Sequence, residues 1–136
     1  MADDTRRLRV ALKANAWFSG LCGLALMIMP GAWAELIGFP LPWALGALGF
    51  GLACFAALAA HAAADVLARR TIITLIIGAD VLWVASSPIA MVTGANTLTV
   101  SGQGVIAVVA LLVAALAAAQ WMGLRAMNRG TVAETW

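Results

Sequence analysis

Residues 104–124 read GVIAVVALLVAALAAAQWMGL, a run without a single charged side chain. A helix needs about 20 mostly apolar residues to cross the roughly 30 Å hydrocarbon core of a bilayer. Three further stretches meet the same requirement, at residues 10–29, 43–64 and 71–92. The sequence therefore predicts four membrane-spanning helices in one chain.

The composition of the whole chain agrees with this prediction. Of its 136 residues, 64% are hydrophobic and 10% are charged, whereas soluble domains are about 45–50% apolar and about 25% charged. A small soluble domain could not hide so much apolar surface, because much of its surface stays exposed. The composition excludes a soluble enzyme, a disordered tail and a disulfide-rich secreted scaffold. We expect one membrane domain over residues 1–136.

The spans are expected to be helices, because no segment shows the alternating polarity of a barrel strand. A helix also satisfies its own backbone hydrogen bonds, as the bilayer core requires. The connections are short, so neighbouring helices should be antiparallel, which predicts an all-α, antiparallel four-helix bundle. The connection at residues 30–42, PGAWAELIGFPLP, carries Trp33 and Phe39 and predicts a short interfacial helical turn. An aromatic anchor is the favoured interpretation there, and a lid or docking surface is the alternative.

The eight Lys and Arg residues fall in three segments, at residues 6–13, 69–70 and 125–129. With four spans, all three segments lie on one side of the membrane, and the positive-inside rule makes that side cytoplasmic. We therefore predict a bacterial inner-membrane protein with both termini in the cytoplasm. The residues expected to contact anionic lipid headgroups are Arg6, Arg7, Arg69, Arg70 and Arg125. No nucleic-acid partner is expected, since these cations already have a role.

Polar residues within the spans are the main indicators of a site, because they are costly in hydrocarbon. Asp80 lies ten residues beyond Arg70, roughly 15 Å along a helix, and should therefore be protonated, paired or hydrogen-bonded. Antiparallel geometry places three other polar residues at similar depths. The predicted intramembrane polar cluster is Asn15, His61, Asp80 and Gln120. Interhelical hydrogen bonding is the favoured interpretation, and a proton or cation site is the alternative.

Two tryptophans accompany these polar residues, at Trp17 and Trp83. Both could simply fill the bundle, or they could line a site for a flat lipophilic molecule such as a quinone or pigment. No cofactor is otherwise predicted. No metal site is predicted either, because the chain has one histidine and no Cys-x-x-Cys motif.

Small residues recur at spacings of three and four in the second and fourth spans, which allows close approach of helices in lipid. The predicted packing residues are Gly46, Gly49, Ala53 and Ala114. They favour tight packing within the bundle. They also suggest a face for a second copy or another membrane protein.

The segments LRVALKANAWFSG (residues 8–20), MPG (29–31) and ADVLW (79–83) resemble a type of small four-span bacterial inner-membrane protein. The resemblance covers residues 6–125 and implies no activity or ligand. No soluble-enzyme motif is present. The expected function is that of a non-enzymatic accessory or interaction subunit. The alternatives are a small proton- or cation-linked transporter or channel using Asp80, and a binder of a lipophilic cofactor.

Overall fold

The computed structural model describes residues 2–133, and the regular structure in that range is helical throughout. The four long helices are α1 (Ala2–Ile28), α3 (Pro42–Ala64), α4 (Arg70–Thr93) and α5 (Val100–Ala133), and a short helix, α2 (Pro30–Ile37), follows α1. All four long helices contain a segment long and apolar enough to cross a membrane. The predicted all-α four-helix bundle is confirmed, and the chain is a small membrane protein.

The apolar surfaces of the long helices are mostly unburied, as expected for helices that face lipid. In each helix, the most apolar 18-residue window is at most 28% buried within the protein. A soluble bundle would bury a continuous apolar stripe on each helix. These helices therefore need a hydrocarbon environment around them.

Helix α2 is set by a proline at its start and a glycine at its end. Pro30 stands in the first turn, where its missing N–H leaves no hydrogen bond unmade. Gly38 adopts a left-handed conformation with φ of 79°, and its N–H donates to the carbonyl of Ala34 at 2.9 Å. The short helical turn predicted for this connection is confirmed.

The connection between α4 and α5 is fastened to the end of α2. The N–H of Thr99 donates to the carbonyl of Ile37 at 2.9 Å, and its hydroxyl donates to the carbonyl of Leu36. The same hydroxyl accepts from the N–H of Gly102 at 2.9 Å and so caps the start of α5. This connection therefore ties the start of α5 to the end of α2.

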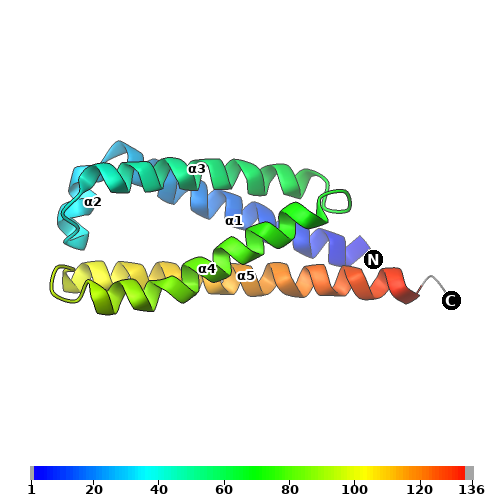
Figure 1. Ribbon diagram of the computed structural model, residues 1–136. Helices are drawn as coiled ribbons and strands as arrows, with labels where there is room; N and C mark the ends of the chain where they lie inside the picture. Colours follow the sequence, from blue (N-terminus) through cyan, green and yellow to red (C-terminus); the bar gives the residue numbers. More distant parts are fainter. Residues whose placement is uncertain (1, 134–136) are drawn as a thin grey trace.

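The long helices form two hairpins, α1 with α3 and α4 with α5 (Figure 1). Helix α1 also packs along α5, which joins the hairpins on one side. Both described chain ends and the α3–α4 connection lie at the same end of the bundle, which we call the basic end because the eight cations gather in these segments. Helices α3 and α4 meet there and diverge toward the other end.

The hydrophobic core sits at the basic end. It consists of Leu8, Leu12, Ala59, Ala62, Ala63, Val66, Ile73, Ile76, Ile77, Leu124 and Met127. Beyond this core the hairpins are bridged again by α2 and the α4–α5 connection. The space between these two closures is where the site lies.

Candidate functional site

Asp80 lies in the middle of α4 and is 5% exposed. Its Oδ2 atom accepts a hydrogen bond from Nδ2 of Asn15 in α1 at 2.6 Å and another from Nε2 of Gln120 in α5 at 3.2 Å. Both amide side chains are fully buried. One carboxylate oxygen thus links three helices, two of them in one hairpin and one in the other.

A fourth residue, Ser19, completes this arrangement. Its hydroxyl donates to Oδ1 of Asn15 at 3.1 Å, and the residue is 4% exposed. Ser19 stands four residues after Asn15, which places both on the same face of α1. We call Asn15, Ser19, Asp80 and Gln120 the polar cluster. Sequence reasoning from depth alone overlooked Ser19, although its spacing from Asn15 was the signal.

Two residues predicted to belong to this site lie elsewhere. His61 is exposed on α3, whose inward face there carries Ala59, Ala62 and Ala63 instead. Trp17 is 73% exposed. It follows Asn15 by two residues, which turns it by about 200° around the helix and away from the cluster. Trp83, by contrast, lies at the site.

The second carboxylate oxygen of Asp80 is unpaired. Oδ1 accepts no hydrogen bond from the described residues, and it is not among the fully enclosed atoms without a partner. Gln120 Oε1 and Trp83 Nε1 are enclosed and lack a partner within the described part of the chain. Asp80 therefore offers an accessible acceptor on one side, while Oδ2 is occupied on the other.

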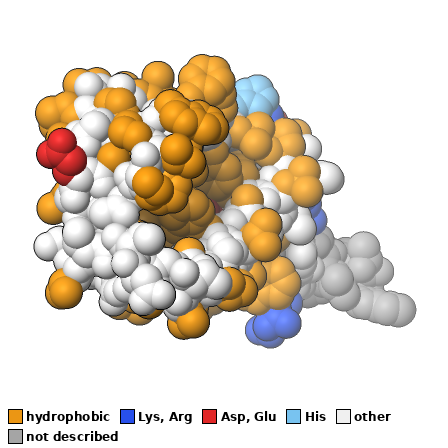
Figure 2. Space-filling view, turned by 60° about the vertical axis from the view of Figure 1, so that its left-hand side comes forward, with side chains coloured by type: hydrophobic (Ala, Val, Ile, Leu, Met, Phe, Trp, Pro, Cys, Tyr) orange, Lys and Arg blue, Asp and Glu red, His pale blue; other side chains and the backbone are white. Residues whose placement is uncertain are grey.

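Asp80 lines a cavity of about 220 Å³ between the two hairpins. Apart from Asp80, the lining residues are Phe18, Ser19, Cys22, Leu48, Gly51, Leu52, Phe55, Ala79, Trp83, Val109 and Val113. All four long helices contribute, and most of the lining is apolar. Figure 2 shows a hollow in the bundle walled by hydrophobic side chains.

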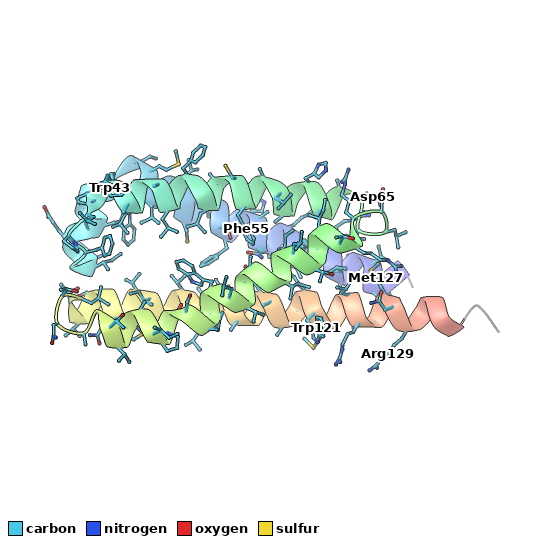
Figure 3. All side chains as sticks on the ribbon, in the orientation of Figure 1. Trp43, Phe55, Asp65, Trp121, Met127 and Arg129 are labelled. Atoms are coloured by element: carbon cyan, nitrogen blue, oxygen red, sulfur yellow. The ribbon has the colours of Figure 1, made fainter. Side chains whose placement is uncertain are left out.

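The opening of this cavity is between α3 and α4. Gly51 of α3 and Ala79 of α4 line the cavity and are exposed at the surface. Phe55 extends from the side of α3 that faces α4 and α5 (Figure 3). The cavity exists because α3 and α4 diverge from the core toward the end opposite the basic end, so no side chain of either helix closes the gap. It opens at the side of the bundle, between these two helices.

The small residues serve mainly to bring α1 and α3 together. A Cβ atom on Gly49 would lie 2.7 Å from the carbonyl oxygen of Gly23. Conversely, a Cβ atom on Gly23 would lie 2.7 Å from the carbonyl oxygen of Gly49 and 3.0 Å from the backbone nitrogen of Ala53. Gly46 has no such contact, since its Cβ would meet nothing closer than 3.9 Å. Ala114 instead lines an open hollow of about 530 Å³ between α4 and α5.

The predicted headgroup residues fall into two groups. Arg6, Arg7 and Arg125 are exposed, and the guanidinium of Arg125 lies 5.0 Å from the ring centre of Trp121. Trp121 and Arg129 point away from the bundle in Figure 3. Arg69 and Arg70 are half-buried and bind the protein itself. Arg69 donates to the carbonyl of His61, and Arg70 donates to Oδ1 of Asn128 at 3.2 Å.

Within the described residues, no three His, Cys, Asp or Glu side chains gather in a way that would hold a metal ion. Comparison of the chain with protein-family models, curated proteins and solved structures gives no match. Fold and site nevertheless define a class. It is a small helical membrane protein with a polar cluster and an apolar cavity inside the bundle.

Proposed function

We propose that the protein is non-enzymatic and binds a small lipophilic molecule in the cavity beside Asp80. The observation that carries this proposal is the cavity itself, because it combines apolar walls with one accessible carboxylate oxygen. Small-molecule sites usually have this form, with a few polar groups in a largely apolar pocket. A cavity of roughly 150 Å³ is known to bind benzene, so about 220 Å³ accommodates one substituted aromatic ring.

A purely structural role for Asp80 accounts for only part of the arrangement. The two bonds at Oδ2 are those expected of a residue that links helices. They do not account for the cavity beside the unpaired Oδ1, in the middle of α4. Enzymatic chemistry has little support, because the lining holds one carboxyl group and no histidine.

Association with another membrane protein or a second copy stays a prediction. Its support from the sequence was the number of small residues in the spans. Gly23, Gly49 and Ala53 are used between α1 and α3 within the chain. The cavity therefore supports ligand binding more strongly than the small residues support an accessory role.

Filling the cavity should weaken ligand binding without disturbing the fold. Gly51 lines the cavity, and a Cβ at this position would meet no atom within 4 Å. We expect Gly51→Leu to lower the affinity for neopentylbenzene, an apolar probe of suitable size, by about tenfold or more. Equilibrium binding to the protein in lipid nanodiscs, corrected with empty nanodiscs, measures this.

Gly104→Leu is the matched control, since Gly104 also has open space around its Cβ position but does not line the cavity. This variant should bind the probe as the native protein does. Saturable binding that survives in Gly51→Leu would place the ligand outside the cavity and contradict the proposal.

We also propose that the basic end faces the cytoplasm of a bacterial cell and that the protein lies in the inner membrane. The proposal rests on the gathering of the eight cations in segments at that end. Alkaline phosphatase fused to the C-terminus, which is active only in the periplasm, should therefore be inactive. The same enzyme inserted after Asn96, at the opposite end, should be active, and the reverse pattern would overturn the orientation.

A further inference from the structure

We infer that the molecule bound in the cavity is a lipophilic cation, such as an organic ammonium ion, whose charge lies beside Oδ1 of Asp80. This inference rests on the proposed function and names the chemical class of its ligand. Three features of the site carry it: the charge of the lining, the aromatic side chains and the direction of the opening.

The lining carries an acidic group without a basic partner. Asp80 is its one carboxyl group, and no Lys, Arg or His is part of it. The eight cations of the chain lie in the segments of the basic end instead. Asn15 and Gln120 donate hydrogen bonds to Oδ2 but are neutral. A cation is therefore the ligand charge that complements the site, since a buried carboxylate without a counter-charge is unfavourable.

Three helices provide aromatic rings around the cavity, through Phe18 in α1, Phe55 in α3 and Trp83 in α4. The faces of aromatic rings attract organic cations, and cages of such rings are the usual means of binding quaternary ammonium groups. The aliphatic residues of the lining suit the apolar part of such a ligand. Gly51 and Ala79 leave the opening toward the bilayer, so a molecule dissolved in lipid can enter from the side.

The hydrogen bonds at Oδ2 also determine where a proton and a cation would compete. Two N–H donors occupy Oδ2, so the neutral acid carries its proton on Oδ1. A cation at Oδ1 takes the place of that proton. The groups that face Asp80 from α1 and α5 are Asn15 and Gln120, neither of which titrates, and the other titratable residue of the lining is Cys22.

A pair of isosteric probes tests the charge directly. Benzyltrimethylammonium and neopentylbenzene have the same shape and differ by one positive charge. In nanodiscs, we expect Asp80→Asn to weaken binding of the ammonium probe by about tenfold or more and to leave binding of the neutral probe unchanged. Acidification should weaken ammonium binding to the native protein and to Cys22→Ser, but not to Asp80→Asn.

Each outcome bears on a different conclusion. Equal binding of the ammonium probe to the native protein and to Asp80→Asn would overturn the inference, while saturable neutral binding would leave the proposed function standing. If the native protein bound neither probe, both would fall. Retained neutral binding by Asp80→Asn shows that its cavity is intact. Phe18→Leu, which removes one aromatic ring of the lining, should weaken ammonium binding more than neutral binding.

Discussion

Replacing Asp80 with leucine is expected to destabilise the bundle by about 2–4 kcal/mol, whereas Asp80→Asn should change its stability by less than about 1 kcal/mol. The leucine variant leaves Nδ2 of Asn15 and Nε2 of Gln120 without their acceptor. A buried donor without a partner costs roughly 1–3 kcal/mol. Asparagine retains one carbonyl oxygen, which can accept both hydrogen bonds in nearly the same shape.

Thermal unfolding in detergent, followed by circular dichroism, measures this difference. Ser87→Ala is the matched control, because Ser87 is also buried in α4 and its hydroxyl bonds to the carbonyl of Trp83 in its own helix at 2.8 Å. Loss of that bond should have little effect on stability. If Asp80→Leu unfolded at the same temperature as the native protein, the hydrogen bonds at Oδ2 would not be stabilising the bundle.

The asparagine variant separates the structural part of Asp80 from its functional part. Its fold should be intact, because Oδ2 is the oxygen that links the helices. Its ammonium binding should be reduced, because the charge at Oδ1 is gone. If the Asp80 carboxyl group both links helices and binds a cation, Asp80→Asn should therefore be stable but deficient in cation binding.

The four helices could be predicted from the sequence because crossing a bilayer imposes both a length and an apolar composition. Their ends could not, since a helix need not stop where the hydrocarbon stops. Helix α1 begins at Ala2, well before the predicted span at residue 10, and α5 continues to Ala133. Asp3 and Asp4 in the first turn of α1 favour this early start through the helix dipole.

The polar cluster was partly predictable for a similar reason. Sequence position gives the depth of a residue, which brought Asn15, Asp80 and Gln120 together in the prediction. Depth says nothing about the direction in which a side chain points, and His61 and Trp17 were included although both face outward. The cavity could not be predicted at all, because it depends on how far α3 and α4 diverge beyond the core.

Sequence position also does not show which small residues of α3 face another helix. The second large effect on stability is expected at one of them, Gly49. From the sequence, Gly46 and Gly49 are both predicted to be packing residues, because both belong to one pattern of small residues. In the structure only Gly49 lies against α1. A methyl group there would be 2.7 Å from the Gly23 carbonyl oxygen and 2.9 Å from side-chain atoms of Leu26 and Met27.

Gly49→Ala should therefore destabilise the protein by about 2–3 kcal/mol, because α1 and α3 must move apart to admit the methyl group. Gly46→Ala should be neutral or stabilising by up to about 1 kcal/mol, since alanine favours the helix and its methyl group meets nothing closer than 3.9 Å. Unfolding of both variants in detergent, beside the native protein, gives the comparison. Each adds one methyl group to the same helix, so the difference between them reports the close contact alone.

The pair Gly23→Ala and Gly49→Ala adds a test of the contact itself. The two glycines face each other across one close approach, so once the first methyl group has separated the helices, the second should cost less. The double variant should then be clearly more stable than the sum of the single effects predicts, by about 1 kcal/mol or more. Strict additivity would mean that the two glycines act independently. Equal stability of Gly46→Ala and Gly49→Ala would show that α1 and α3 are not held together at this point.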